Sequence, residues 1–157
     1  MKTAIIYASK HGTTQKVANE LSTLLPQHDV TMLDAGKNHK IDLTTYDQII
    51  VGGSIHAGMI QTSLQKFIER NTTSLLQKPL GIFLCCMDEK EAMNQFEKAF
   101  PEILRHHAKC CQCVGGEFLF EKMNFLEKLM TRKIAGVNET VSKLRYENIK
   151  ALAQSMT

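Results

Sequence analysis

Short apolar runs alternate with amphipathic segments along the whole chain. The apolar runs are almost uninterrupted by polar residues, which is typical of strands that are buried on both faces. Five such runs predict strands, at residues 4–8, 30–33, 48–53, 80–87 and 110–114. Four segments with apolar residues at helical spacing predict helices, at residues 15–25, 62–71, 89–107 and 148–156. Pro26 ends the first helix, and Pro101 marks a break or a restarted first turn in the third.

The alternation of strands and helices predicts the layout of the sheet. Strands that are buried on both faces form a parallel sheet, and the helices between them supply right-handed crossovers. We expect one α/β domain over residues 1–157, with a five-stranded parallel sheet in the order 2-1-3-4-5 and helices on both faces. In such a sheet a ligand binds beyond the carboxyl ends of the strands, where the strand order reverses. The candidate binding residues therefore lie in the loops after Ala8, Gly53, Met87 and Val114.

Composition and charge narrow the classes of protein to consider. The chain has 157 residues, of which 43% are hydrophobic, so it can bury the core of one domain. Its 19 basic and 16 acidic residues give a net charge of +3 without a run of like charge, which argues against a nucleic-acid partner. No apolar stretch approaches the roughly 20 residues that cross a bilayer. The first residues lead directly into an apolar strand, so we expect no secretory leader and a cytoplasmic location.

The five cysteines lie inside apolar segments, and their number is odd. A secreted disulfide framework would be smaller and would place its cysteines in loops. Cys110 and Cys113 have the spacing of a redox or metal-binding pair, but residues three apart on a strand point to opposite faces. We therefore interpret the cysteines as small buried hydrophobic residues in a reducing compartment, and we predict no metal site.

The loop after the first strand carries hydroxyl groups, a glycine and the start of a helix. Free N–H groups and the dipole of a helix start favour an anion, and glycine lets the backbone close around it. One interpretation is therefore a phosphate site, with the candidate residues Ser9, Lys10, His11, Gly12, Thr13 and Thr14. The other is that Thr13 or Thr14 simply caps the helix. The loop matches neither the Gly-Lys-Ser/Thr phosphate motif nor the Gly-x-Gly-x-x-Gly dinucleotide motif.

Three further loops reach the same edge of the predicted sheet. Glycines at the end of the third strand allow a flat ligand to approach the backbone, and Ser54 offers hydrogen bonds to ring heteroatoms. His56 is either an acid or base or a solvated side chain, and Phe118 and Phe120 either cover a ring or pack in the core. The candidate residues are Ser54, Ile55, His56, Ala57 and Gly58 in the second loop, Cys86, Met87 and Asp88 in the third, and Gly116, Glu117 and Phe118 in the fourth.

These loops resemble those of a known group of proteins. The six residues from Ser9 to Thr14 are similar to the FMN-phosphate loop of flavodoxins. The segment from Gly52 to Gly58, followed by Phe67, resembles the menaquinone-dependent protoporphyrinogen IX dehydrogenase family, a flavodoxin-like group. The same family is resembled near the C-terminus, at Phe125, Leu126, Glu127, Lys128, Leu129, Met130, Gly136, Glu139, Thr140 and Tyr146. The resemblance therefore runs over nearly the whole chain.

The resemblance implies a flavodoxin-like fold that binds FMN noncovalently. The phosphate of FMN would lie on the six residues of the first loop, and its isoalloxazine ring between the candidate residues of the other three loops. The implied activity is the oxidation of protoporphyrinogen IX to protoporphyrin IX, a step of heme biosynthesis, with electrons passed to a quinone. No side chain is predicted to be catalytic, because the flavin carries the redox chemistry.

Two other functions are compatible with the same fold. One is a small flavodoxin that carries electrons between protein partners. Such carriers are typically strongly acidic, whereas this chain has an isoelectric point of about 8.6. The other is a non-enzymatic interaction module of the receiver type, which needs clustered acids where the first strand instead ends in Ser9 and Lys10. The sequence favours the flavoenzyme over both.

The segment 121–133 combines basic and apolar residues. It carries Lys122, Lys128 and Arg132 beside Met123, Phe125, Leu126, Leu129 and Met130. A basic amphipathic segment is typical of a peripheral contact with an anionic membrane, here near a quinone pool. The alternative is an ordinary packed helix whose lysines are solvated. The sequence leaves both interpretations open.

Overall fold

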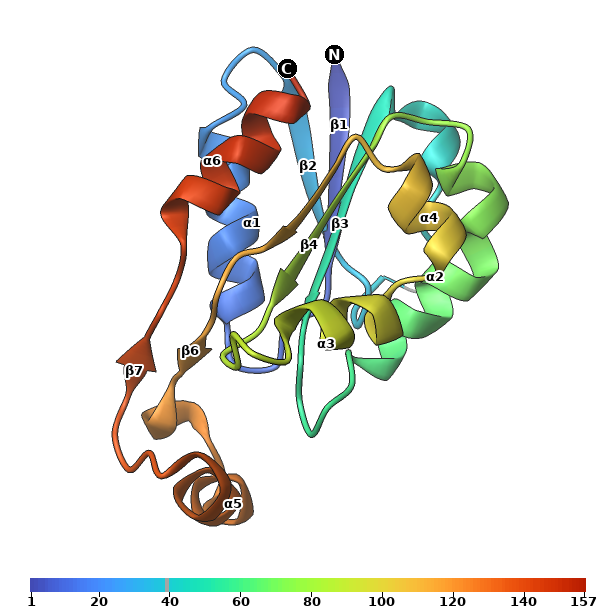
Figure 1. The fold of residues 1–157 in the computed structure, drawn as a ribbon. Coiled ribbons are helices and arrows are strands. Elements are labelled where there is room, and N and C mark those ends of the chain that lie inside the picture. The colour runs from blue at the N-terminus through green and yellow to red at the C-terminus, as the bar shows by residue number, and fades with distance from the viewer. Residues whose placement is uncertain (39) are drawn as a thin grey trace.

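A parallel sheet of five strands forms the centre of the computed structural model, which describes residues 1–38 and 40–157 (Figure 1). The strands are β1 (Lys2–Tyr7), β2 (Asp29–Asp34), β3 (Gln48–Ser54), β4 (Leu80–Cys85) and β5 (Cys110–Cys113). Their order across the sheet is β2-β1-β3-β4-β5, and every neighbouring pair is parallel. The predicted α/β fold, of the flavodoxin-like type, and the predicted strand order are confirmed.

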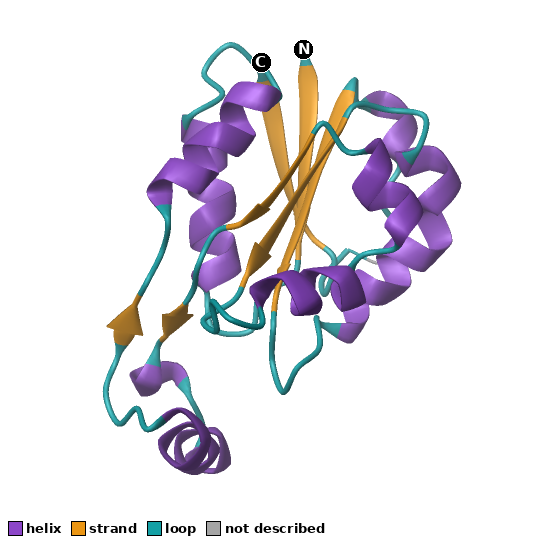
Figure 2. Cartoon of the chain, viewed as in Figure 1, coloured by secondary structure: helices purple, strands orange, loops and turns teal. Residues whose placement is uncertain are grey.

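Helices cover both faces of the sheet (Figure 2). One face carries α1 (Thr13–Thr23) and α6 (Tyr146–Ser155), and the other carries α2 (Thr62–Leu75), α3 (Ala92–Ala99) and α4 (Glu102–His107). The residues of β1 alternate between the two cores: Ile5 packs with α1 and α6, whereas Ala4 and Ile6 pack with the other layer. Both faces of the strand are therefore apolar, which explains why its sequence is an uninterrupted hydrophobic run.

The helix predicted over residues 89–107 is divided in two. Phe100 has an extended backbone and ends α3, and Pro101 precedes α4 as its N-cap residue. Proline has no N–H to donate and disfavours helical geometry in the residue before it, so a helix stops there and a new one starts. Of the two interpretations of Pro101, the structure shows a break that is followed by a new first turn.

An excursion of the chain between β5 and α6 was not predicted as a structural unit. It contains β6 (Glu117–Phe118), the short 3-10 turn η2 (Phe120–Lys122), α5 (Phe125–Ala135) and β7 (Val141–Ser142). Outside the excursion, a second short 3-10 turn, η1 (Leu43–Thr45), precedes β3. β6 and β7 pair in antiparallel fashion and form a stalk that carries α5 away from the sheet (Figures 1 and 2). We call residues 117–142 the excursion.

The base of the excursion is closed by a tight backbone contact. The N–H of Lys143 donates to the carbonyl of Gly116 at 2.8 Å, and the N–H of Arg145 donates to that of Val114 at 2.9 Å. Gly115 has a φ of 72°, and a Cβ atom there would lie 1.9 Å from the carbonyl oxygen of Lys143. Only glycine fits this position, so the two ends of the excursion meet at one place.

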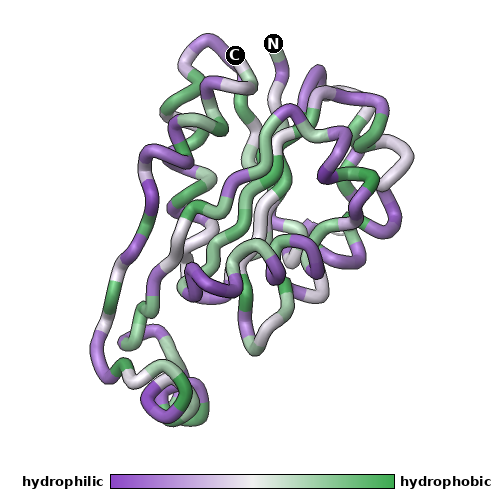
Figure 3. The backbone as a smooth tube through the Cα atoms, viewed as in Figure 1, coloured by the Kyte–Doolittle hydropathy of each residue, from purple (hydrophilic) through white to green (hydrophobic). Residues whose placement is uncertain are grey.

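Hydrophobic residues follow the central strands and appear again on α5, at the far end of the excursion (Figure 3). In α5 no residue is buried, although Phe125, Leu126 and Ile134 are large and apolar. Among the described residues, no helix has both the length and the hydropathy needed to span a bilayer.

Candidate functional site

The loops that follow the parallel strands meet at one edge of the sheet, as predicted. The rings of His11, after β1, and His56, after β3, lie edge to face with their centroids 5.6 Å apart. After β4, the N–H of Cys86 donates to the carbonyl of Gly115, which follows β5, at 2.8 Å. The site predicted from four separate stretches of sequence is therefore one region of the surface.

The first loop leads into α1 without a side-chain cap. Gly12 is the N-cap residue, with a φ of 103°, and no side chain accepts a hydrogen bond from the first turn of the helix. The alternative interpretation, in which Thr13 or Thr14 caps the helix, is therefore wrong. Ser9 closes the loop, because its Oγ accepts a hydrogen bond from the N–H of Gly12 at 3.0 Å.

Thr14, on the first turn of α1, holds a buried hydroxyl group without a hydrogen-bond partner in the described part of the chain. The thiol of Cys85 lies nearby but not in hydrogen-bonding geometry, and sulfur is a weak acceptor. An unpaired buried hydroxyl costs about 1–3 kcal/mol. Together with the uncapped N–H groups of α1, this hydroxyl forms a set of donors that fits the oxygens of a phosphate group.

Two carboxylates of the excursion reach the first loop. Glu127 accepts a hydrogen bond from Nε2 of His11 at 2.6 Å and lies 3.4 Å from Nζ of Lys10. Glu117 accepts hydrogen bonds from the hydroxyl of Thr13 at 3.1 Å and from Nζ of Lys16 at 2.8 Å. Sequence reasoning placed Glu117 among the ring-binding residues, but the structure places its side chain against the start of α1. The hydroxyl proton of Thr13 is used in this hydrogen bond.

The pKa values of both carboxyl groups reflect these contacts. Burial raises the pKa of Glu117, but hydrogen bonds from Lys16, Ser142 and Thr13 and the charge of Lys16 outweigh it, so the net shift is downward. The same balance holds for Glu127, where His11 and Lys10 outweigh the burial. The hydrogen bond to Glu117 in turn raises the pKa of Lys16. Both carboxyl groups are therefore ionised at neutral pH.

The second loop is a tight turn whose base is held by Gln61. The side chain of Gln61 donates to Oγ of Ser54 at 2.6 Å and accepts from the N–H of Ser54 at 3.2 Å. Ala57 and Gly58 both have positive φ, 49° and 77°, between the paired backbones of His56 and Met59. An alanine in this conformation costs about 1–2 kcal/mol, and such strain is found mainly at functional sites.

His56 is half-buried against the first loop, so it is not the freely solvated side chain of one interpretation. Burial lowers the pKa of His56, the positive charges of His11 and Lys10 lower it further, and Glu127 opposes the shift. His56 is therefore neutral at neutral pH. Its Nε2 lies 3.3 Å from the hydroxyl of Ser54 in the same loop, and its ring contacts that of His11, so it connects the second loop to the first.

The glycines at the end of β3 are explained by packing. A Cβ atom on Gly52 would lie 2.0 Å from the ring of Phe83, and one on Gly53 would lie 2.6 Å from Cδ2 of Leu64. A side chain at Gly52 would collide with the ring of Phe83 in the core, and one at Gly53 would require Leu64 to move, whether or not a ligand approaches. The reason that the sequence suggested for these glycines, access for a flat ligand, is not needed to account for them.

The third loop is held by hydrogen bonds within itself and to α3. The thiol of Cys86 donates to the side-chain carbonyl of Gln95 at 2.6 Å, and Asp88 accepts from the N–H of Lys90. Burial raises the pKa of the Cys86 thiol, and that of Cys85 to about 12, so neither forms a thiolate at neutral pH. Cys85 and Cys86 are buried, as predicted, whereas the three cysteines of β5 are only half-buried.

The aromatic residues of the fourth loop have different surroundings. Phe120 is buried, and the charged ends of Lys128 and Arg132 lie over its ring, with the Nζ and Cζ atoms 5.5 and 5.1 Å from the ring centroid. It therefore holds α5 in place. Phe118 lies on β6 and is half-buried, and the side chain of Met87 lies against Gly116.

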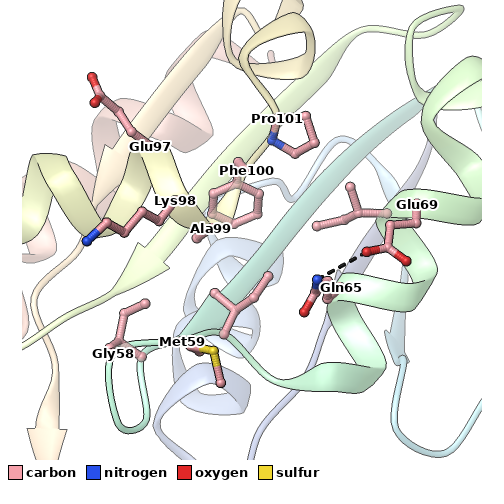
Figure 4. Close-up of a pocket in the computed structure, with 12 residues that line it drawn as sticks. Gly58, Met59, Gln65, Glu69, Glu97, Lys98, Ala99, Phe100 and Pro101 are labelled. Atoms are coloured by element: carbon pink, nitrogen blue, oxygen red, sulfur yellow. Dashed lines mark hydrogen bonds between the residues drawn. The ribbon is translucent and has the colours of Figure 1, made fainter.

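A cavity of about 390 Å³ adjoins the second loop (Figure 4). Its floor is apolar and includes Ile55, Ile60 and Phe100, and the charged residues that line it are Glu69, Glu97 and Lys98. The cavity exists because the chain turns between α3 and α4, where Pro101 forms part of its wall. Sequence reasoning located the second loop but missed this cavity, and the break at Pro101 was the one signal that pointed to it.

Comparison with known proteins identifies the family. The family model of the flavodoxin domain matches residues 4–144. The chain belongs to the flavodoxin family. It is also 22% identical, over 166 residues, to the protoporphyrinogen IX dehydrogenase [quinone] of Escherichia coli K12, covering 98% of this chain and 91% of the relative.

Solved structures of flavodoxins have the same fold. A short-chain flavodoxin associated with a bacterial microcompartment aligns with a TM-score of 0.66 at 14% identity, over 99% of this chain and 95% of that one. Rubredoxin oxygen:oxidoreductase of Desulfovibrio gigas aligns at 0.64 and 18% identity, over 98% of this chain, which spans 34% of that longer protein. The flavodoxin of Fusobacterium nucleatum bound to flavin mononucleotide aligns at 0.53 and 13% identity, over 71% of this chain and 68% of that one.

Glu117 is expected to make the stability of this chain depend on pH. Its folded-state pKa is lowered, so its contribution is complete above the pKa of an unfolded glutamate, about 4.3, and is lost as the pH falls toward the folded-state value. E117Q should lower the free energy of unfolding by about 1–3 kcal/mol near neutral pH. The difference from the wild type should shrink when denaturant unfolding is repeated at about pH 3 to 4.

The matched control is E121Q, which removes the charge of an exposed glutamate in the same excursion. It should leave the free energy of unfolding unchanged within about 0.5 kcal/mol. An E117Q effect that is the same at every pH would contradict the ionic contact with Lys16.

Proposed function

We propose that this chain is an FMN-binding oxidoreductase that oxidises protoporphyrinogen IX and passes the electrons to a quinone. The observation that carries the proposal is the first loop, where uncapped N–H groups and the unpaired hydroxyl of Thr14 converge at the start of α1. The full-length similarity to a protoporphyrinogen IX dehydrogenase and the FMN bound to a flavodoxin of the same fold support it.

The residues of the first loop would hold the phosphate of FMN. The hydroxyl of Thr14 has a proton to donate, and that of Ser9, which accepts a bond from Gly12, retains its own proton for a second donation. Thr13 donates to Glu117 and would contribute its backbone N–H. When bound, the flavin supplies the redox chemistry, and the protein binds and orients it.

The effect of T14V on FMN affinity tests the cofactor assignment. Valine keeps the shape of threonine but removes the hydroxyl, and a hydrogen bond to a charged group contributes about 1.5–3 kcal/mol. We expect the dissociation constant for FMN, measured by quenching of flavin fluorescence, to rise by about 10- to 100-fold. T14S, which restores the hydroxyl, should bind FMN nearly as tightly as the wild type.

The control is T23V, which removes an exposed hydroxyl from the last turn of the same helix, where it bonds only to the carbonyl of Asn19. It should leave the affinity for FMN unchanged. If T14V also binds FMN like the wild type, the phosphate does not lie on this loop.

The cavity beside the second loop is the proposed site for the quinone. Its apolar floor suits a flat, uncharged ring, and its volume of about 390 Å³ exceeds that of a small quinone. Two carboxylates line the cavity, Glu69 and Glu97, against one ammonium group, Lys98, and this excess of negative charge disfavours the negatively charged propionates of a porphyrinogen. The two substrates would therefore occupy different places.

Turnover of porphyrinogen separates this enzyme from an electron carrier. When protoporphyrinogen IX and a water-soluble quinone are present, the FMN-loaded protein should increase the rate at which porphyrin fluorescence appears. A99F, which fills the cavity, should lower the quinone-dependent rate by roughly tenfold or more and leave FMN bound. A tenfold effect corresponds to a loss of about 1.4 kcal/mol in the binding free energy of the quinone. M93F, on an exposed residue of the same helix, should have the wild-type rate.

Three outcomes of this assay bear on the proposal. FMN binding without turnover would favour the alternative of a carrier between redox protein partners. Turnover that A99F leaves unchanged would place the quinone outside the cavity. A protein that takes up no FMN would favour the non-enzymatic interaction module.

A peripheral membrane contact through residues 121–133 is part of the proposal. In α5, Glu127 contacts His11 of the first loop, and Lys128 and Arg132 contact Phe120, while the large apolar residues of the helix are exposed. The exposed fractions are 81% for Phe125 and 78% for Ile134. Exposed large apolar residues in a segment that also carries basic residues fit the surface of an anionic lipid bilayer, where the quinone pool is found.

Flotation with lipid vesicles tests this contact. The wild-type protein should bind vesicles that contain phosphatidylglycerol and bind those of phosphatidylcholine weakly, because basic residues are attracted to anionic lipid. F125E combined with I134E should weaken binding by at least about tenfold, since each buried large side chain contributes about 1.5–3 kcal/mol.

M93E, which alters an exposed apolar residue far from α5, should bind vesicles like the wild type. A concentration-dependent dimer that is abolished by the double substitution would instead show that a second copy covers this face.

A further inference from the structure

The excursion places an unpaired ammonium group beside the first loop. A Cβ atom built on Gly12 would lie only 3.3 Å from Nζ of Lys122, at the end of η2. Lys122 makes no ion pair or side-chain hydrogen bond with any residue that the structure describes. A positive charge therefore lies beside the N-cap residue of α1 without a protein carboxylate to neutralise it.

The other charged side chains at this place are already engaged. Glu127 holds Lys10 and His11, with contacts of 3.4 and 2.6 Å, and Glu117 holds Lys16 at 2.8 Å. Lys10 and Lys16 are thus already paired with the two carboxylates of the excursion and are not available as partners for an anionic ligand. Of the cations around the loop, Lys122 is left available.

The turn that carries Lys122 is anchored to the rest of the excursion. The side chain of Phe120 is buried beneath Lys128 and Arg132, and its backbone N–H donates to the hydroxyl of Thr140 at 3.1 Å. The N–H of Lys122 donates to the carbonyl of Leu119 at 2.9 Å. The backbone of Lys122 is therefore held in place, and only its flexible side chain adjusts to an anion.

A phosphate monoester carries a charge of about −1.5 to −2 at neutral pH. The uncapped N–H groups of α1 and the buried hydroxyl of Thr14 supply hydrogen bonds to it, but they carry no full positive charge. We propose that Lys122 is the counter-ion of this phosphate, brought to the first loop by the excursion, so that the protein selects FMN over riboflavin. The inference rests on the proposed binding of FMN and names the residue that determines its specificity.

K122M tests the inference by comparing two flavins that differ only in the phosphate. The wild type should bind FMN more tightly than riboflavin. K122M should weaken FMN binding by about tenfold and should leave riboflavin binding unchanged within about twofold. The expected loss lies at the lower end of the range for a charge-assisted contact, because this lysine is exposed to solvent. Added salt should weaken FMN binding to the wild type more than to K122M, because salt screens the charge of Lys122.

Two further variants control for structure. K122R keeps the charge and should retain the preference for FMN. K133M removes an exposed charge from α5 in the same excursion and should bind both flavins like the wild type.

Different failures have different meanings in this experiment. Equal affinity of the wild type for FMN and riboflavin, or an equal loss of both in K122M, overturns the role of Lys122 and leaves flavin binding intact. A wild-type protein that binds neither flavin overturns the inference together with the proposed function.

Discussion

Unsatisfied hydrogen-bond donors at the start of α1 are the constraint on which the site depends. A helix leaves its first N–H groups without partners, and here Gly12 provides no side chain to accept from them. The hydroxyl of Thr14 adds a buried donor that no described residue satisfies. These donors lie at the carboxyl edge of the sheet, because β1 ends there and the chain passes through the short first loop into α1. An acceptor with several oxygens removes the cost that they impose.

The excursion brings two carboxylates and an ammonium group to a first loop that itself carries Lys10. Its glutamates pair with cations of the loop and of α1, and Lys122 is left beside Gly12. These contacts also determine where the excursion lies, because Glu117 and Glu127 are its ionic links to the first loop. The same residues thus hold the excursion against the domain and shape the electrostatic field around the candidate phosphate site.

α5 differs from an ordinary surface helix because its large apolar residues are exposed. Glu127 contacts the first loop, and Lys128 and Arg132 contact Phe120, whereas Phe125 and Ile134 are exposed on opposite sides of the helix. In a helix that packs on a core, the apolar face is the buried one. Exposed apolar residues on this scale are typical of an interaction surface, and the stalk of β6 and β7 presents that surface away from the sheet (Figure 1).

The sequence by itself determined the central sheet and the edge at which the candidate loops meet. Apolar runs identified all five strands, because β1, β3 and β4 are buried on both faces and the edge strands β2 and β5 are half-buried, and the parallel order then brought four loops to one edge. The residues from Ser9 to Thr14 were identified as a candidate phosphate site because the chemistry of a helix start is visible in the local sequence. Pro101 likewise indicated the division between α3 and α4.

Only the tertiary structure decided which residues meet at that edge. Thr13 and Glu117 are 104 residues apart, and His11 and Glu127 are 116 apart, so no local pattern predicts either contact. The strands β6 and β7 have two residues each, too few for a periodic signal. The positions of Lys122 beside Gly12 and of the exposed apolar residues of α5 depend on how the excursion folds back. That path is set by long-range packing around Phe120 and Gly115, which the order of residues along the chain does not reveal.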